Sequence, residues 1–180
     1  MANGNNSDRG FIMTRTPLRV SFAGGGTDLA EFYEREPGVV LSTAINQYIY
    51  VTVKRHGSVF NESIRLNYSK SEQVQTIDQI ENDIACECLR YLEIDPPINF
   101  STVPDLRAST GLGGSGSFAV GLLNALHAFR GERVSAGQLA EEACHIEIEV
   151  LKQPIGKQDQ YAAAFGGLNF FSFMAGGALT

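Results

Sequence analysis

The sequence predicts an α+β domain, and three observations lead to that prediction. Segments typical of strands and of helices are mixed along the chain, without the regular βαβ alternation of a parallel sheet. The composition is that of an ordinary globular protein, with 43% hydrophobic and 19% charged residues. A chain of 180 residues is long enough to bury roughly 70% of the surface of its unfolded form, so a substantial core is possible.

The first half of the chain contains mostly strand patterns. Residues 1–12 are predicted to form a polar, disordered tail ahead of a domain at 13–180, although the first strand pattern already begins at residue 11. That strand ends at a run of three glycines, after which Thr27 or Asp28 is expected to cap a short helix. β-Branched and aromatic residues then indicate further strands. The expected strands are 11–23, 39–55 (one long or two short) and 64–68.

The second half alternates helices with single strands. Isoleucines at helical spacing predict a helix over 76–93. A glycine-rich loop at 111–116 precedes an apolar helix that ends near residue 129. Ser135 and Gln138 have capping-box spacing and open the next helix. The expected helices here are 76–93, 117–129, 135–152 and 158–165, and the expected strands are 98–103 and 168–173.

Charge and cysteine content restrict the possible partners and the compartment. Fourteen basic residues face 20 acidic ones, which gives a net charge of −6. Such a chain binds nucleic acid and anionic membranes poorly, so neither is expected as a partner. Three cysteines without an apolar leader fit buried structural thiols in a reducing cytoplasm. No apolar run reaches the ~18 residues of a transmembrane helix, and oligomeric state stays open.

The segment Ser109-Thr-Gly-Leu-Gly-Gly-Ser-Gly-Ser117 is the most informative part of the sequence. A glycine-rich loop that opens a helix can aim successive N–H groups at a phosphate, and the helix dipole favours the anion. A tight turn before a core helix is the alternative. The candidate phosphate-binding residues are Gly111, Leu112, Gly113, Gly114, Ser115, Gly116 and Ser117.

Three common glycine motifs fit this segment poorly. The dinucleotide fingerprint requires a second strand after the helix, and another helix follows instead. The phosphate loop of the Walker type requires Gly-Lys-Ser/Thr at its end, where this chain has Gly116-Ser117. A nucleophile elbow requires Gly-x-Ser-x-Gly, and the last glycine is absent. The segment therefore predicts a phosphate loop of another kind.

Three segments in order resemble the GHMP kinases, the family of galactokinase, homoserine kinase and mevalonate kinase. GLGGSGS at 111–117 resembles the family's second motif, with Gly114 in place of its first serine. TPLRVSFAGGGTD at 16–28 resembles the first motif. The third segment runs from Glu147 to PIGKQDQ at 154–160. The first and third segments, together with the strand that follows the third, are most similar to bacterial kinases of D-glycero-D-manno-heptose 7-phosphate.

The resemblance implies a fold, a reaction and two cofactors. The fold would be the N-terminal domain of the ribosomal protein S5 domain 2 type, whose ferredoxin-like C-terminal partner is absent from this chain. The chain then looks truncated, and we expect it to be inactive or nearly so alone. The reaction would be transfer of the γ-phosphoryl group of ATP, with Mg²⁺, to the anomeric hydroxyl of a sugar phosphate. Two alternatives are a kinase of a free sugar such as galactose or fucose, and a sugar and ATP sensor without catalysis.

The resemblance also assigns roles to individual residues. Asp159 would accept or orient the proton of the sugar hydroxyl, and Arg19 would stabilise charge near the transferred group. Asp28 falls on the aspartate that holds sugar hydroxyls in galactokinases. Ser115 and Glu147 would be the protein ligands of Mg²⁺. Helical periodicity alone does not distinguish Glu147 from Glu149, because both flank the same apolar stripe; spacing within the resemblance selects Glu147.

Overall fold

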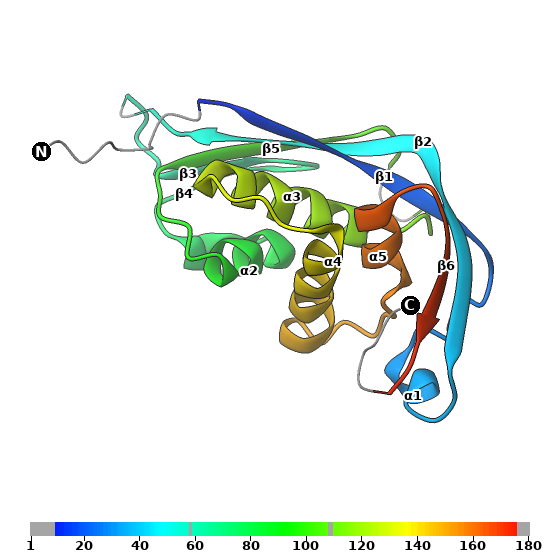
Figure 1. Cartoon of the computed structure of the whole chain (residues 1–180). Helices are drawn as coiled ribbons and strands as arrows, with labels where there is room; N and C mark the ends of the chain where they lie inside the picture. Colours follow the sequence, from blue (N-terminus) through cyan, green and yellow to red (C-terminus); the bar gives the residue numbers. More distant parts are fainter. Residues whose placement is uncertain (1–9, 58, 108–109, 176–180) are drawn as a thin grey trace, which may run out of the picture.

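The computed structural model describes residues 10–57, 59–107 and 110–175. A six-stranded mixed sheet has its helices packed against one face (Figure 1). The strands are β1 (Ile12–Ala23), β2 (Gly38–Arg55), β3 (Ile64–Asn67), β4 (Ser71–Val74), β5 (Ile98–Pro104) and β6 (Leu168–Phe173). The helices are α1 (Ala30–Tyr33), α2 (Asp83–Tyr91), α3 (Gly114–Arg130), α4 (Ala136–Cys144) and α5 (Gln158–Phe165).

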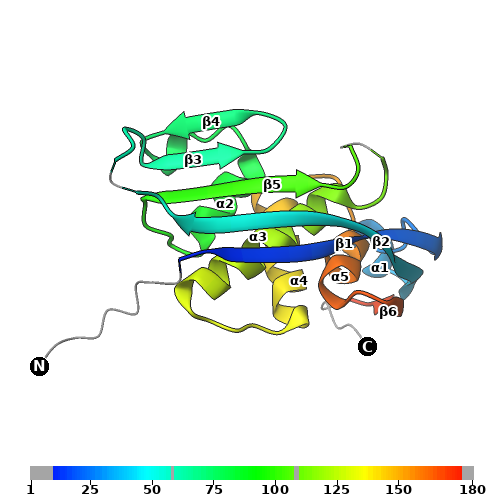
Figure 2. The ribbon, with the colours of Figure 1, turned by 90° about the horizontal axis from the view of Figure 1, so that it is seen from above.

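The long strand β2 organises the sheet. One side of β2 pairs with β1 along most of its length, from Ile12 opposite Val53 to Ala23 opposite Leu41. Its other side pairs with β5 near one end and with β6 near the other. The strand order is β1-β2-β5-β3-β4, with β6 paired to β2 (Figure 2). The bend of β2 between these two partners brings β1, β6 and the start of α5 to one end of the molecule.

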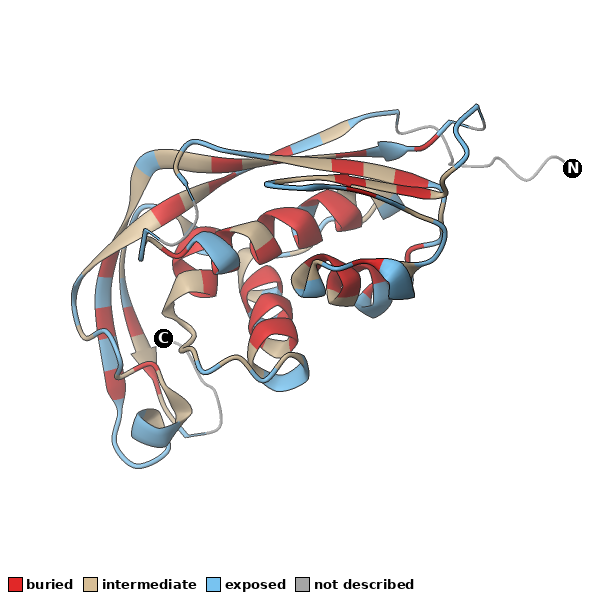
Figure 3. Ribbon diagram, turned by 180° about the vertical axis from the view of Figure 1, so that it is seen from behind, coloured by how far each residue is buried: buried red, intermediate tan, exposed pale blue. Residues whose placement is uncertain are grey.

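The core lies between the sheet and the helices. Helix α3 crosses beneath the sheet and is buried over most of its length (Figure 3). Its side chains belong to one core cluster with inward-facing residues of β2, β3 and β5 such as Val51, Leu66 and Phe100. Gly121 lies where α3 passes β1, and a Cβ there would be 2.7 Å from Oγ1 of Thr16. The glycine therefore allows the close approach between the middle of α3 and β1.

Most of the predicted elements are confirmed, including the two candidate strands at 11–23 and 39–55. The predicted helix at 76–93 is wrong in its first half, where a 3₁₀ turn at Ile77–Gln79 precedes α2. Asn82 caps α2, its side-chain oxygen accepting from the N–H of Ala85 at 2.9 Å. The isoleucines of the turn still pack on the core, which is why their spacing resembled one helix. The short polar edge strand β4 was not predicted.

Two further predictions need correction. Thr27 and Asp28 do not cap α1, whose N-cap is Leu29 without a side-chain cap. Instead, the hydroxyl of Thr27 donates to the Val39 carbonyl at 2.9 Å and joins this loop to β2. The helix expected over 135–152 is α4 followed by a wide π-helical turn at His145–Val150. Ser135 does cap α4, its hydroxyl accepting from the N–H of Gln138 at 3.1 Å.

Only residues 10–12 of the tail predicted at 1–12 are among the described residues. Residues 1–9 lie outside them, and β1 begins at Ile12. Cys86, Cys88 and Cys144 are buried free thiols, as expected for structural cysteines. Within the described ranges, none of the helices combines the length and the apolar character that a membrane span needs.

Candidate active site

The glycine-rich loop turns sharply into α3. Gly111 and Gly113 have φ values of 72° and 78°, in the left-handed region that favours glycine. Helix α3 begins at the next residue, Gly114, so the N–H groups of its first turn point out of the helix end. Strand β1 fixes the loop, because the backbone N–H of Arg19 donates to the Leu112 carbonyl at 3.1 Å. This helix end is suited to binding an anion.

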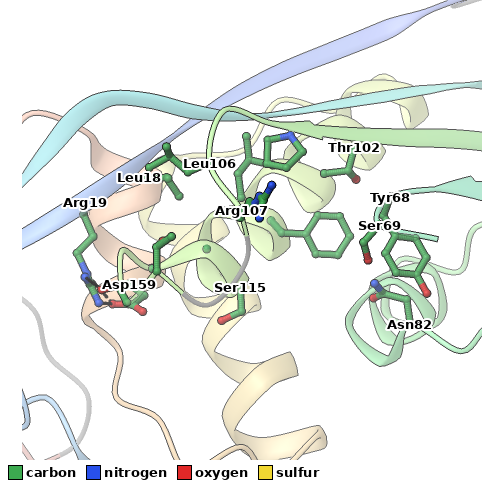
Figure 4. Close-up of a pocket in the computed structure, with 17 residues that line it drawn as sticks. Leu18, Arg19, Tyr68, Ser69, Asn82, Thr102, Leu106, Arg107, Ser115 and Asp159 are labelled. Carbon is green, nitrogen blue, oxygen red and sulfur yellow. Dashed lines mark hydrogen bonds and ion pairs between the residues drawn. The ribbon is translucent and has the colours of Figure 1, made fainter.

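A cavity of about 810 Å³ opens in front of this helix end. Figure 4 shows Arg19 and Asp159 at one end of it and Tyr68, Ser69 and Asn82 at the other, with Ser115 between them. Leu18, Ile49, Leu106 and Phe118 add apolar surface to its wall. The cavity is charged at the Arg19–Asp159 end, and its middle combines the cation of Arg107 with these apolar side chains, which suits a ligand with an anionic part and a flat ring.

The predicted loop residues divide into two groups. Gly111, Gly113, Gly114 and Ser115 line the cavity, whereas Leu112, Gly116 and Ser117 do not. Ser117 is buried, and its hydroxyl donates to the Pro17 carbonyl at 2.8 Å. Its N–H donates to the Gly113 carbonyl at 2.9 Å. The expectation of a phosphate contact from Ser117 is therefore corrected, because both of its donors bond within the protein.

Arg19 and Asp159 form an ion pair at the charged end of the cavity. Nε of Arg19 donates to Oδ1 of Asp159 at 2.8 Å, and Nη2 makes a second, closer contact with the same oxygen. Asp159 lies in the first turn of α5, while Arg19 comes from β1. Burial raises the pKa of the Asp159 carboxyl above its usual value, and the charge and hydrogen bonds of Arg19 oppose that shift.

A second, smaller cavity of about 250 Å³ also borders this pair. Arg19 and Asp159 line both cavities. Gly26 and Asp28 contribute from the loop after β1, and residues 154–156 and Gln158 contribute from the segment before α5. An ion pair that borders two cavities is suited to transferring a group from a ligand in one cavity to a ligand in the other.

Asp28 is almost completely buried, with 1% of its surface exposed. Its Oδ1 accepts from the N–H of Gly26 at 3.0 Å, and its Oδ2 accepts from the N–H of Gln158 at 3.0 Å. Gly156 makes room for the carboxylate, since a Cβ at this position would be 1.9 Å from Oδ2. Asp28 therefore ties the first residue of α5 to the loop after β1, while it also lines the smaller cavity.

Glu147 lies in the π-helical turn after α4 and is fully buried. Burial raises the pKa of its carboxyl, Gln160 and Ser115 oppose that shift, and the charge of Asp159 adds to it. Its Oε1 is buried and has no hydrogen-bond partner among the described residues. An unsatisfied carboxylate oxygen near a serine hydroxyl matches the oxygen ligands that Mg²⁺ prefers. Glu149, in contrast, pairs with His145 on the surface at 2.7 Å.

Among the residues that contact the carboxylates of the site, three were not identified from the sequence. Gln158 accepts from the Ser21 hydroxyl through Oε1 at 2.5 Å, and Gln160 donates to Glu147 through Nε2 at 2.6 Å. Both glutamines flank Asp159 in the sequence Gln-Asp-Gln, which is the local signal that could have indicated them. Gly156 is the third, and its role depends on a contact that only the folded chain makes.

Comparison with known proteins agrees with this fold. Residues 82–167 match the family model of the GHMP kinases N terminal domain. The chain is 35% identical over 171 residues to the D-glycero-alpha-D-manno-heptose 7-phosphate kinase of Campylobacter jejuni, covering 90% of this chain and 50% of the relative. It is 25% identical over 161 residues to the galactokinase of Thermotoga maritima, covering 86% of this chain and 44% of the relative. The chain thus spans about half the length of these curated relatives.

Solved structures show the same fold. A D-glycero-D-manno-heptose 1-phosphate kinase from Bacteroides thetaiotaomicron aligns with a TM-score of 0.83 and 28% identity, covering 93% of this chain and 58% of that one. The mevalonate kinase of Methanococcus jannaschii aligns with a TM-score of 0.72 and 18% identity, covering 96% of this chain and 56% of that one. The family match over residues 82–167 and these alignments show that the chain has the fold of the GHMP kinase N-terminal domains.

Proposed function

We propose that this chain forms the nucleotide-binding half of an ATP-dependent sugar kinase. The observation that supports it most is the position of the Arg19–Asp159 pair, which lines both cavities. The larger cavity would hold ATP, with its phosphates at the N-terminus of α3 and its base toward Phe118 and Tyr68. The smaller cavity would hold the reacting end of the sugar. The two substrates would then meet at Asp159.

In the proposed reaction, the sugar hydroxyl oxygen attacks the γ-phosphorus, and the bond from that phosphorus to the β–γ bridging oxygen breaks to release ADP. Asp159 accepts the hydroxyl proton or orients the hydroxyl, a role that requires the carboxylate form. Arg19 keeps that carboxylate in place and puts positive charge beside the transferred group. Positioning and charge neutralisation are what phosphoryl transfer mainly requires.

Ser115 and Glu147 would hold the Mg²⁺ that accompanies ATP. The unsatisfied Oε1 of Glu147 and the nearby Ser115 hydroxyl supply two oxygen donors, and phosphate oxygens and waters would complete the octahedral shell. When bound, Mg²⁺ neutralises charge on the phosphates. The two protein donors come from α3 and from the π-helical turn, so the contact between these elements would set the position of the phosphates.

We propose D-glycero-D-manno-heptose 7-phosphate, phosphorylated on its anomeric hydroxyl, as the acceptor. The support is the 35% identity to a kinase of that name, against 25% for the galactokinase. A free sugar such as galactose or fucose is the second candidate, because Asp28 lines the smaller cavity and by resemblance falls on the aspartate that holds sugar hydroxyls in galactokinases. A sensor without catalysis is less well supported, since Asp159, Ser115 and Glu147 are all present.

The test is ADP release with MgATP and a panel of acceptors, on the 180-residue chain and on the complete translation product of its gene. Turnover with heptose 7-phosphate that Asp159→Asn abolishes would support the proposal. Turnover with galactose or fucose but not with heptose 7-phosphate would support the second candidate, a kinase of a free sugar. Binding of ATP and sugar without turnover in either form would contradict a kinase and favour the sensor.

The metal assignment has its own matched pair of variants. Glu147→Gln should raise the Mg²⁺ concentration needed for half-maximal turnover by about 10-fold or more, because a charged ligand is replaced by a neutral one. Glu149→Gln, two residues along on the exposed side, should leave it unchanged. Equal effects of the two substitutions would contradict the assignment of Glu147.

A further inference from the structure

Gln160 is the residue directly after Asp159, and it is completely buried. Its side-chain Nε2 donates to Oε2 of Glu147 at 2.6 Å, across the contact between α5 and the π-helical turn. A glutamine beside a buried carboxylate is chemically suited to this contact, because its amide supplies a donor and no charge. The bond uses one of the two carboxylate oxygens.

The other oxygen of Glu147 is left free by this contact. Oε1 is buried and has no hydrogen-bond partner in the described part of the chain. A buried carboxylate oxygen without a donor is unfavourable, so folded proteins seldom keep one without a use. Fixing Oε2 on Gln160 also fixes the rotation of the carboxylate, and therefore the direction in which Oε1 points.

We propose that Gln160 is a positioning residue, which holds Glu147 by Oε2 so that Oε1 is presented to the metal ion of the proposed reaction. This inference rests on the proposed function, because it needs Glu147 to be a metal ligand. Partners of metal-ligating carboxylates commonly tune the site in this way. The neighbouring position of Asp159 adds a consequence: one turn of α5 places both the group that handles the sugar proton and the group that orients the metal ligand.

The contact between α3 and α5 supports this arrangement. A Cβ on Gly116 would be 3.1 Å from the backbone nitrogen of Gln160 and 2.9 Å from Cβ of Asp159. The start of α5 therefore lies tightly against the first turn of α3, the turn that carries Ser115. A small shift of Gln160 would move Glu147 relative to Ser115, although Gln160 lines neither cavity.

The experiment measures binding of Mn²⁺ and ADP by electron paramagnetic resonance and calorimetry, with Mn²⁺ as the probe for Mg²⁺. It is run on the 180-residue chain and on the complete translation product. Gln160→Leu removes the donor but keeps a similar volume, and we expect Mn²⁺ binding in the presence of ADP to weaken by about 10- to 100-fold. Binding of ADP without metal should change much less.

A matched control removes the same kind of bond elsewhere. Gln138 donates to Oε1 of Glu142 through Nε2 at 2.8 Å, on α4. Gln138→Leu should alter thermal stability without altering Mn²⁺ affinity. A Gln160→Leu variant whose Mn²⁺ affinity equals that of the unmodified protein would overturn the inference, since a merely structural role predicts no metal effect.

A reciprocal exchange keeps the inference testable if Gln160→Leu does not fold. In the double variant Glu147→Gln with Gln160→Glu, an amide still faces a carboxylate, so thermal stability should return toward that of the unmodified protein. Mn²⁺ affinity should stay low, because the charged oxygens now belong to residue 160. Recovery of full affinity in this variant would overturn the inference. If the unmodified protein binds no Mn²⁺ with ADP, the proposed function itself fails, and that outcome is distinct.

Discussion

The guanidinium of Arg19 links the side chain of Asp159 to the backbone of the glycine-rich loop. Nε donates to Oδ1 of Asp159 at 2.8 Å, and Nη1 donates to the carbonyl of Gly111 at 2.8 Å. One strand residue therefore sets both the position of the carboxylate and that of the loop whose glycines line the larger cavity. Arginine is suited to this task because its planar fork offers several donors in fixed directions, whereas lysine presents a single point charge.

Replacing Arg19 should slow turnover and shift its pH dependence. In Arg19→Met we expect kcat to fall by about 10²- to 10³-fold, the magnitude typical for loss of one charge-stabilising donor. Arg19 opposes the upward shift of the Asp159 pKa, so its removal should raise that pKa further. The acidic limb of the kcat profile should therefore move to higher pH. Steady-state rates of the complete translation product between pH 5 and 8 measure both effects.

Arg15 provides the control for this variant. It lies on the same strand, and its guanidinium stacks over the Tyr48 ring at 4.5 Å from the centroid. Arg15→Met should leave kcat and the acidic limb unchanged. If the acidic limb of the kcat profile lies at the same pH in Arg19→Met as in the unmodified protein, Arg19 does not act on the pKa of Asp159.

Asp159→Asn should remove activity without destabilising the fold. The folded-state pKa of Asp159 is raised, so the folded protein binds a proton more readily than the unfolded chain, and ionisation opposes folding. That penalty is fully present above the folded-state pKa and vanishes as pH falls below the unfolded value. We therefore expect the Tm of the variant at pH 7 to equal or exceed that of the unmodified protein. The difference should shrink toward pH 4, and a large Tm loss at pH 7 would contradict this account.

The sequence predicted most of the fold because its signals were local. Alternating strand residues in β1 and β2, the glycines before α3 and the serine cap of α4 all act within a few positions. The single helix predicted over 76–93 was wrong in its first half, because the spacing of apolar residues indicates which residues are buried and not which backbone conformation they adopt. Ile77 and Ile80 reach the core from a 3₁₀ turn. Strand β4 was not predicted because its residues Ser71–Val74 are stabilised by pairing with β3, and the local sequence carries no signal of that pairing.

From the sequence, site residues were proposed only where a single residue matched a position in one of the family motifs. The helical spacing of apolar residues did not show which of Glu147 and Glu149 faces inward. The helix widens to a π-helical turn at His145, so the α-helical repeat of about 3.6 residues no longer applies there. The wider turn directs Glu147 inward and leaves Glu149 on the surface. The partners of Gln158 and Gln160 lie 13 or more positions away in the chain, and only tertiary structure brings them together.

Two glycines of the loop region should respond differently to alanine. In Gly116→Ala, the new Cβ would be 2.9 Å from Cβ of Asp159, so α3 and α5 must separate. We expect a loss of about 1–3 kcal/mol in the free energy of unfolding, the range for overpacking. Gly114 has open space where a Cβ would stand. Gly114→Ala should leave stability unchanged or slightly higher, since alanine favours helix. Urea unfolding of the two variants provides the comparison, and equal losses would contradict the close contact of the helices.

Asp28→Asn should lower the stability of the fold and weaken binding of the sugar. The carboxylate accepts from the backbone N–H groups of Gly26 and Gln158 through different oxygens. An asparagine keeps one oxygen and turns an NH₂ group toward one of these donors, so we expect a loss of about 1–3 kcal/mol in the free energy of unfolding. A carboxylate has about four acceptor positions, so Asp28 can still accept a sugar hydroxyl in the smaller cavity. We therefore expect KM for the sugar to rise at least several-fold, with KM for ATP unchanged.

Asp105→Asn is the control, because Oδ2 of Asp105 also accepts a backbone N–H, that of Tyr48 at 2.8 Å, but on the exposed surface. Its effect on stability should be smaller, since water replaces the lost acceptor, and KM for the sugar should not change. A fall in kcat for Asp28→Asn with both KM values unchanged would remove Asp28 from the sugar site. Asp28 would then act only by holding the start of α5, and through it Asp159.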